Sequence, residues 1–451
     1  MRRALCTLCL LALAALELQA YEDGQPRPNL IVIMADDLGY GELSCYGNKS
    51  YKTPHLDALA RAGVRFTDYH SNGAVCSPTR AALLTGRYQQ RAGVGGVIYA
   101  GFDQNRNHGL HQSETTFAES LGVAGYQNGC FGKWHLGYEK KFNPVHHGFN
   151  RFRGYVSGNI DYQSHFDRVG VYDWWEGLEH IREKGYSTHL ITRHAVKFIE
   201  EHRDRPFCLY VPHEAPHTPF QGPGDPGFRV KGKVVPEKRA AAFKKRAYRE
   251  MVQEMDKGVG EIVATLKRLG LEKNTVVFFI SDNGATGFGS NGSLRGNKGQ
   301  LWEGGHRVPA IASWPGRIAA GSTCDDLSAG MDIFPTLLEL AGVKVPKKLR
   351  LDGRSLVPSF LGKQPPAPRK VYWGAGRQQA MRDGPWKYVR ELKGQKAAAL
   401  YNLEQDPGEQ KNLAKKEASR LAAMKKDYSA WQKDVAAGAT RQPPVPASRK
   451  K

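Results

Sequence analysis

Two short polar segments follow apolar stretches of the chain and together offer oxygen ligands for a metal ion. Asp36 and Asp37 come directly after one apolar run, and Asp282 and Asn283 come just after another. In open α/β sheets, ligands bind where parallel strands end at their carboxyl side, so we expect the two pairs to meet there. Carboxylate and amide oxygens suit Ca²⁺ or Mg²⁺ and are poor ligands for soft metals. Taken alone, each pair is also typical of a loop or a helix cap.

A cysteine at the expected start of a helix is a candidate nucleophile. Residues 76–87 read Cys-Ser-Pro-Thr-Arg-Ala-Ala-Leu-Leu-Thr-Gly-Arg. Pro78 fits the first turn of a helix and Gly86 fits its C-terminal end. Cys76 is therefore expected at a helix N-terminus, where backbone N–H groups and the helix dipole favour negative charge, and Arg80 lies one turn further on. This setting suits a nucleophile that faces an anionic ester, whereas an isolated cysteine is usually a buried structural residue.

Two other motifs suggest chemistry that their surroundings disfavour. His213-Glu-Ala-Pro-His217 has the HExxH spacing of zinc proteases, which requires both histidines on one helix face. Pro216 lies inside the motif and disfavours a helix there. Residues 287–292 match GxGxxG, but they lie seven residues beyond the preceding apolar run and no clear helix follows them. We therefore expect neither a zinc protease nor a dinucleotide site.

The elements that position these residues are typical of an α/β fold. The runs 29–35, 207–211 and 275–280 are almost continuously apolar, as expected for parallel strands buried on both faces. An amphipathic helix is expected over 239–269, between the second and third of these runs. Strands that alternate with helices predict a mostly parallel sheet flanked by helices.

A smaller C-terminal domain is expected after a stretch rich in Pro, Gly and Lys. Short antiparallel strands are predicted at 370–373 and 386–389, followed by a helix over 414–435. The last residues are basic and proline-rich, a composition typical of disorder. The predicted organisation is a signal peptide (1–20), a large domain with the candidate catalytic residues (21–345), a linker (346–368), a C-terminal α+β domain (369–440) and a disordered basic tail (441–451).

The N-terminus and the charge indicate an exported protein. Arg2 and Arg3 precede an apolar run over 4–16, which is too short to span a bilayer and typical of a secretory signal. We find no other long apolar segment and expect no stable membrane insertion. The chain has 65 Lys and Arg against 44 Asp and Glu, and residues 361–451 hold 20 of the basic and 8 of the acidic ones. A basic exported protein can bind acidic polymers, but no nucleic-acid motif is present.

Removal of the predicted signal peptide leaves an odd number of cysteines, which indicates that one has a separate role. The other four allow three disulfide pairings, among which the sequence does not choose. None of the five remaining cysteines belongs to a CxxC pair, so a cysteine-rich zinc site is not expected. The five cysteines are Cys45, Cys76, Cys130, Cys208 and Cys324.

The segment around Cys76 resembles the sulfatase family, whose signature Cys-x-Pro-x-Arg is followed by Thr-Gly. Residues 76–80 and 85–87 match this signature, and the resemblance covers nearly the whole mature chain. It is greatest to members of the arylsulfatase A and N-acetylgalactosamine-6-sulfatase type. The resemblance implies an alkaline-phosphatase-like fold with a small C-terminal sheet-and-helix domain. Further family motifs occur in order at 35–41, 132–137, 215–219, 281–284, 299–305, 332–336 and 400–409.

The resemblance also implies the cofactors and the role of each candidate residue. In this family a formylglycine-generating enzyme oxidises the cysteine to formylglycine (3-oxoalanine), whose hydrate is the nucleophile. Cys76 would then be its precursor, which leaves an even set of cysteines. The implied roles are Ca²⁺ ligation by Asp36, Asp37, Asp282, Asn283 and the modified Cys76, orientation of the nucleophile by Arg80, sulfate binding by Lys133 and Lys298 with a looser match at Ser157, protonation of the leaving alcohol by His217, and base catalysis by His135.

These roles agree with elementary electrostatics. A sulfate monoester is an anion that repels an anionic nucleophile, and a divalent cation with two lysines offsets that repulsion. A leaving alkoxide needs a proton, which a histidine can supply near neutral pH. Lys133 and His135 are two residues apart, so an extended segment would point both to the same side.

The sequence therefore predicts an exported, calcium-dependent sulfuric ester hydrolase that acts on a sulfated carbohydrate or an aryl sulfate. One alternative is a phosphatase or phosphodiesterase of the alkaline phosphatase superfamily, which usually carries a Ser or Thr nucleophile and a two-zinc site. A second alternative is a non-catalytic binder of acidic polysaccharide that uses the basic C-terminal region. The sugar, the position of its sulfate and the oligomeric state are left open.

Overall fold

A computed structural model of the protein describes residues 27–101, 104–361 and 367–445. The predicted signal peptide (1–20), part of the predicted linker (362–366) and the end of the predicted tail (446–451) lie outside the described residues. Within the described ranges, no helix is both long and apolar enough to cross a membrane.

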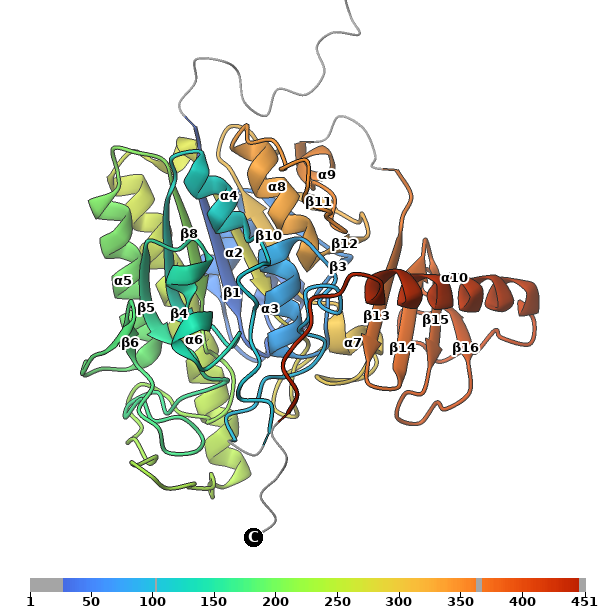
Figure 1. Cartoon of the computed structure of the whole chain (residues 1–451), viewed down its shortest axis with the longest axis horizontal. Coiled ribbons are helices and arrows are strands. Elements are labelled where there is room, and N and C mark those ends of the chain that lie inside the picture. The colour runs from blue at the N-terminus through green and yellow to red at the C-terminus, as the bar shows by residue number, and fades with distance from the viewer. Residues whose placement is uncertain (1–26, 102–103, 362–366, 446–451) are drawn as a thin grey trace, which may run out of the picture.

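A ten-stranded sheet forms the centre of the larger part of the protein (Figure 1). The runs predicted as buried parallel strands are β1, β8 and β9, which lie side by side and are buried along their whole length. β10 runs antiparallel to β2 and β9, and β6 runs antiparallel to β5 and β7. The remaining neighbouring strands of the sheet pair in parallel, which confirms the predicted mostly parallel sheet. The strand order is β11 (Ser322–Cys324), β2 (Val64–Phe66), β10 (Ala310–Ser313), β9 (Thr275–Ser281), β1 (Asn29–Ala35), β8 (Phe207–Pro212), β4 (Gln127–Lys133), β5 (Arg151–Tyr155), β6 (Trp175–Glu176) and β7 (Glu179–His180).

Helices cover both faces of this sheet because the side chains of β1 alternate between two buried clusters. Leu30 and Val32 pack in the cluster that contains α3, α4, α8 and α9. Ile31 and Ile33 pack in the cluster that contains α2, α5 and α6, and α6 is the amphipathic helix predicted from the sequence. The helices are α2 (Pro54–Arg61), α3 (Cys76–Thr85), α4 (Phe117–Val123), α5 (Ser187–Glu201), α6 (Ala241–Arg268), α7 (Glu303–His306), α8 (Ile333–Leu340) and α9 (Val357–Leu361).

Several short elements connect these layers. A two-stranded parallel sheet and five 3-10 helices lie in the loops between the main strands and helices. They are β3 (Tyr69–His70), β12 (Ser328–Ala329), η1 (Ser44–Tyr46), η2 (Lys140–Phe142), η3 (Pro144–His147), η4 (Glu272–Asn274) and η5 (Gly330–Asp332).

The C-terminal region forms a four-stranded antiparallel sheet covered by one helix (Figure 1). Strands were expected at 370–373 and 386–389, and β13 and β15 contain them. Trp373 of β13 and Tyr428 of the covering helix α10 share a buried aromatic cluster. The elements are β13 (Lys370–Ala375), β14 (Gln378–Asp383), β15 (Trp386–Arg390), β16 (Ala399–Asn402) and α10 (Ala418–Ala436).

The chain beyond α10 differs from the disordered tail expected from Arg441 onwards. Residues 441–445 run back along the larger part of the protein instead (Figure 1). The Gln442 amide donates hydrogen bonds to the carbonyl oxygens of Gly93 at 2.9 Å and Gly109 at 2.7 Å. These backbone partners fix the start of the tail despite its proline-rich composition.

The five cysteines of the described chain are free thiols, so no disulfide forms among them. Cys130 and Cys208 lie on the neighbouring strands β4 and β8 but are out of register, since Cys130 is opposite Tyr210. The expected pairing of four cysteines is therefore corrected: these thiols, apart from half-buried Cys45, fill buried positions in the structure.

A buried ion network joins the C-terminal sheet to the larger part of the protein. The Lys387 ammonium group of β15 lies 2.9 Å from a carboxylate oxygen of Glu303 in α7 and 2.9 Å from one of Glu409. Arg382 of β14 contacts Asp68 at 3.0 Å and Glu303 at 3.4 Å. Charges buried to this degree are tolerated because each has an opposite charge beside it.

Replacing Lys387 by alanine is expected to destabilise this junction strongly. The change leaves the carboxylates of Glu303 and Glu409 buried without their shared cation, and breaking a buried pair in this way costs about 3–5 kcal/mol. Thermal denaturation followed by circular dichroism should show Tm lowered by several degrees. The matched control is Lys393→Ala, because Lys393 is exposed. A Lys387→Ala variant that melts with the control would contradict a stabilising role of the network.

Candidate active site

Four of the five predicted metal ligands, all except Cys76, meet at the carboxyl ends of two adjacent strands. β1 and β9 pair in parallel with Ala35 opposite Ser281, so the residues that follow each strand lie side by side. The backbone N–H of Asp37 donates to the Asp282 carboxylate at 3.1 Å, and the Asn283 amide donates to the Asp37 carboxylate at 2.8 Å. All four side chains, including that of Asp36, are buried.

This cluster has the donor set of a hard cation site. The side-chain amide oxygen of Asn283, Oδ1, is buried and has no hydrogen-bond partner in the described chain. Ligand atoms of Asp36, Asp37, Cys76 and His217 lie within 4.8 Å of one another. An orphaned amide oxygen beside three carboxylates fits Ca²⁺, which takes oxygen ligands in a flexible geometry. The residues present therefore fit the calcium ion that the resemblance implies.

Cys76 lies next to this cluster at the start of α3. The helix begins at Cys76 and ends at Thr85, and Gly86 follows in the left-handed conformation with φ 66°, as predicted. The Cys76 sulfur lies 3.5 Å from a carboxylate oxygen of Asp36 and 3.4 Å from the Lys298 ammonium nitrogen. Burial raises the pKa of the Cys76 thiol to about 12 despite the nearby lysines. An unmodified Cys76 is thus a protonated, weak nucleophile at neutral pH.

Arg80 and Lys133 hold the carboxylates from the side of the sheet. The Arg80 guanidinium donates to Asp282 at 2.8 and 3.2 Å and to the backbone carbonyl of Lys133 at 3.0 Å. The Lys133 ammonium group, at the end of β4, is paired with Asp36. Burial and the adjacent Asp36 raise the pKa of Asp282 to about 6.

Lys298 and His217 approach the carboxylates from the side of the pocket. The Lys298 ammonium nitrogen lies 2.6 Å from Asp37, and the His217 Nε2 lies 3.7 Å from the same carboxylate. Burial alone would raise the pKa of Asp37, but Lys298 and His217 hold it at about 2. Burial and the Lys298 charge lower the pKa of His217 well below its usual value.

Without a metal ion, the negative and positive charges of the side chains at this site are equal in number. The three carboxylates are those of Asp36, Asp37 and Asp282, and the three cations are Arg80, Lys133 and Lys298. A bound divalent cation would therefore give the cluster a net positive charge, which favours an anionic substrate.

His135 and Ser157 line the same pocket but lie apart from the carboxylates. β4 ends at Lys133 and His135 has φ 56°, so the alternation of an extended strand does not continue. Lys133 reaches Asp36, whereas the His135 Nε2 donates to the Ile98 carbonyl oxygen at 2.9 Å. The expectation that both side chains point the same way on an extended segment is therefore not met. The Ser157 hydroxyl donates to a backbone carbonyl oxygen at 3.0 Å.

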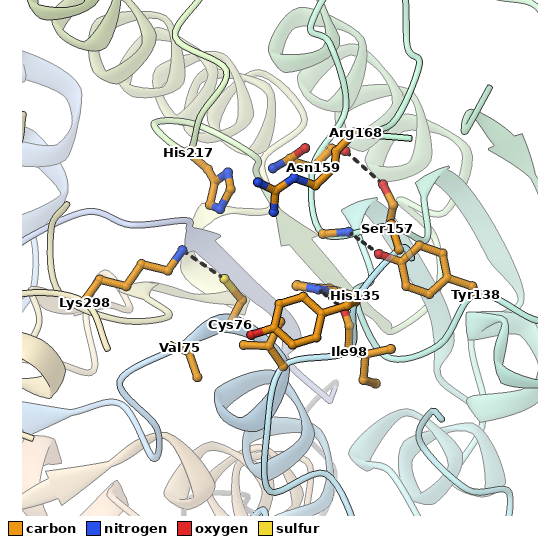
Figure 2. Close-up of a pocket in the computed structure, with 14 residues that line it drawn as sticks. Val75, Cys76, Ile98, His135, Tyr138, Ser157, Asn159, Arg168, His217 and Lys298 are labelled. Atoms are coloured by element: carbon orange, nitrogen blue, oxygen red, sulfur yellow. Dashed lines mark hydrogen bonds between the residues drawn. The ribbon is translucent and has the colours of Figure 1, made fainter. Parts of the chain in front are cut away.

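A pocket of about 270 Å³ opens above Cys76 (Figure 2). The side chains of His135, His217 and Lys298 line it together with the Cys76 sulfur, and apolar side chains such as Ile98 form part of its wall. It has room for a sulfate group and about one sugar ring. Sequence reasoning missed several residues of this pocket, for which no motif gave a signal: Tyr99, Tyr138, Asn159 and Arg168.

A second group of candidate metal ligands belongs to the buried ion network. His70, Glu303 and His306 have ligand atoms within 4.8 Å of one another. The two histidines are hydrogen-bonded to each other through their Nδ1 atoms at 2.9 Å, and Glu303 is already paired with Lys387 and Arg382. Cations of the protein occupy the place that a metal ion would need, so we interpret this group as structural.

In the described structure, the two motifs that the sequence disfavoured lack the helix that a zinc protease or a dinucleotide site requires. Residues 213–217 follow β8 as a non-helical segment, and residues 287–292 form a loop with no helix after it. His213 is buried, and neither of its ring nitrogens has a partner in the described structure. Burial lowers its pKa to about 3.

Replacing His213 by leucine should reduce the sensitivity of folding to acid. At pH 5 His213 is neutral in the folded protein but protonated in the unfolded chain, so stability falls as the pH drops below about 6.5. The difference at pH 5 amounts to about 2 kcal/mol for this one group. We expect the loss of Tm between pH 7.5 and pH 5 to be smaller in the variant. His111→Leu at an exposed position is the control, and equal losses in both variants would contradict the prediction.

Comparison with known proteins places the chain among the sulfatases. A family model for sulfatases matches residues 28–343, and a model for the C-terminal part of N-sulphoglucosamine sulphohydrolase matches residues 296–433. The chain is 38% identical over 391 residues to N-acetylgalactosamine-6-sulfatase of Mus musculus, covering 79% of this chain and 71% of that one. It is 34% identical to arylsulfatase A of Bos taurus, covering 86% and 83%.

A solved structure with the same fold is that of Ps i-CgsB in complex with k-i-k-neocarrahexaose. It superimposes with a TM-score of 0.82 at 28% identity, covering 92% of this chain and 95% of that one. The family match extends over the metal-ligand candidates, Cys76 and the pocket. The chain therefore belongs to the sulfatase family and is a sulfuric ester hydrolase.

Proposed function

We propose that this enzyme is an exported, calcium-dependent sulfatase that uses formylglycine at position 76 to remove sulfate from glycans. The observation that carries the proposal is the position of the Cys76 sulfur, 3.5 Å from Asp36 and 3.4 Å from Lys298 at the start of α3. A precursor placed there delivers its modified form to a carboxylate cluster that fits a metal and to a cation that attracts sulfate. Export is supported by the N-terminal sequence, which has the pattern of a secretory signal.

Asp36, Asp37, Asp282 and Asn283 are the residues that would hold the calcium ion. When bound, the ion would neutralise charge on the sulfate and on the nucleophile as it attacks. Formylglycine, when formed from Cys76, would supply an oxygen nucleophile in place of the weakly acidic thiol. Arg80 lies one turn along α3 and holds Asp282, so it fixes the arrangement of the carboxylates around that position.

The lysines and histidines of the pocket have complementary tasks. Lys298 and Lys133 bind the sulfate oxygens and offset their charge. The His217 Nδ1 donates to the Thr218 carbonyl oxygen at 2.6 Å, which leaves Nε2 facing Asp37 and the pocket. The lowered pKa of His217 leaves Nε2 without a proton in the free enzyme, so Nε2 must first take up a proton, which the negative charge of a bound sulfate favours, before it can pass that proton to the leaving alcohol. The Nε2 of His135 is used by Ile98, so its partnerless Nδ1 is the atom that can accept a proton.

A sulfated glycan is the substrate class that the surroundings favour. N-acetylgalactosamine-6-sulfatase is among the relatives, and Ps i-CgsB, which shares the fold, was solved in complex with k-i-k-neocarrahexaose. The strongly basic composition, with a net charge of +21, suits an anionic polymer. The pocket, of about 270 Å³, holds about one sugar ring.

Competing ester hydrolysis tests the proposed function directly. The purified enzyme, produced in a host that makes formylglycine, is incubated with 4-methylumbelliferyl sulfate and with the matching phosphate. We expect sulfate release to exceed phosphate release by at least about a hundredfold, because the described site has one cluster of carboxylates that fits a metal ion, whereas the phosphatase alternative usually has a two-zinc site. A preference for the phosphate would favour the phosphatase alternative. Binding of sulfated polysaccharide without any hydrolysis would favour the non-catalytic alternative.

A further inference from the structure

Arg168 faces the active-site pocket with an unpaired positive charge. Figure 2 shows Arg168 beside Asn159 and His217, across the pocket from Cys76 and Val75. No carboxylate of the described chain forms an ion pair with the Arg168 guanidinium, and no Asp or Glu lines the pocket. This wall therefore carries a charge that no carboxylate in the described ranges neutralises.

Lys298, which also lines the pocket, lies where the reacting sulfate group is expected to bind. Lys298 lies 2.6 Å from Asp37 and 3.4 Å from the Cys76 sulfur, so its charge serves the reacting group. Arg168 extends from a different loop, on the opposite wall. The pocket thus presents cations at two separated places, and one of them has no counter-charge among the residues that the structure describes.

The backbone that carries Arg168 is held in a fixed turn. The Asp167 carboxylate accepts the backbone N–H groups of Val169 at 2.9 Å and Val171 at 2.8 Å. Gly170, with φ 80°, lets the chain reverse, and it accepts the N–H of Gly232 at 2.9 Å from a neighbouring loop. The side chain of Arg168 is exposed, but the backbone turn that carries it is already fixed before a ligand binds.

Asn159 adds a second donor to the same wall. It is 8% exposed and lines the pocket, and its carbonyl oxygen accepts a hydrogen bond from the buried Arg229 at 2.8 Å. Because the oxygen is occupied by Arg229, the amide N–H₂ group is the atom free to donate towards a ligand. A guanidinium and an amide donor side by side are suited to an anionic group.

We infer that Arg168 and Asn159 form a second anion subsite, and that the preferred substrate sugar carries another anionic group besides the sulfate that is removed. The inference rests on the proposed function and narrows its substrate class to glycans with two anionic groups close together. The second group is a further sulfate or a carboxylate, since both accept two hydrogen bonds from a guanidinium. Arg168 is in this role a specificity-determining residue.

Paired substrates test the inference. Sulfate release is measured from 4-methylumbelliferyl sulfate, N-acetylgalactosamine 6-sulfate, N-acetylgalactosamine 4,6-disulfate, and the disaccharide of an unsaturated uronic acid with N-acetylgalactosamine 6-sulfate. We expect the wild type to prefer one of the two-anion sugars over the one-anion sugar by about tenfold in kcat/KM. The sugar that is preferred tells a second sulfate from a carboxylate. The preference should weaken as salt is raised, since an exposed arginine is screened.

The variant Arg168→Gln should remove this preference, mainly through a higher KM for the two-anion sugar, and Arg168→Lys should keep part of it. Arg203→Gln, which removes an exposed arginine beyond α5, controls for the change in net charge. Equal kcat/KM for one-anion and two-anion sugars in the wild type, or a preference that survives Arg168→Gln, overturns the inference. Failure of the wild type to release sulfate even from the aryl ester overturns the proposed function instead.

Discussion

Replacing Cys76 by alanine should lower kcat for sulfate release by about 10⁴-fold or more, because the variant has no precursor for the nucleophile. The remaining groups of the site can still bind the substrate, so KM is expected to change much less. The variant should fold, since Cys76 is 2% exposed and alanine removes one sulfur atom at the start of α3. Steady-state kinetics on an aryl sulfate measures the effect.

A matched control separates the chemistry from the loss of a buried thiol. Cys208 on β8 is also fully buried, but it lies outside the charged cluster. Burial is the only cause that raises the pKa of its thiol. Cys208→Ala should therefore keep wild-type kcat while lowering stability modestly. The peptide that contains residue 76 should carry an aldehyde in active wild-type enzyme. Full activity of a preparation whose Cys76 is entirely thiol would falsify the role proposed for it.

The residues of the site that lie at the ends of strands and helices could be predicted from short stretches of sequence. Pro78 and Gly86 restrict where a helix can begin and end, and α3 has these limits. The buried strands β1 and β9 were recognisable as apolar runs, and their parallel pairing places Asp36 beside Asp282. In such cases a residue's position follows from the nearest strand or helix end, which the sequence encodes within a few residues.

The rest of the site depends on contacts between loops that are distant in the sequence. Asn159 is oriented by Arg229, seventy positions along the chain, and Arg168 extends from a turn with no periodic pattern. Lys387 could not be distinguished from a surface lysine of an antiparallel strand, because its burial arises only when the C-terminal sheet meets α7. β14 was not predicted because its sequence is mostly polar and Met381 is its one large apolar side chain.

Removal of calcium is expected to lower kcat/KM by at least about a hundredfold, since the metal would supply much of the positive charge at the site. Without it, the three carboxylates are balanced by Arg80, Lys133 and Lys298, and this cluster has no net positive charge to offset that of the sulfate. The buried side-chain amide oxygen of Asn283 also loses the partner that we propose for it. Dialysis against EGTA followed by kinetics on an aryl sulfate tests this, with calcium added back to restore activity.

The variant Asn283→Leu distinguishes a metal site from a structural cluster of acids. It removes the orphaned oxygen, and also the amide N–H that donates to Asp37, while keeping every charge, so the affinity for calcium should fall at least about tenfold and activity should recover at higher calcium concentrations. Calcium should also raise the Tm of the wild type more than that of the variant, because the stabilisation that a ligand gives to the state that binds it grows with the logarithm of the affinity. Elemental analysis gives the metal content of each preparation. Undiminished activity in a protein shown to be free of metal would exclude calcium from the reaction and leave Arg80, Lys133 and Lys298 as the cations that offset the charge of the sulfate.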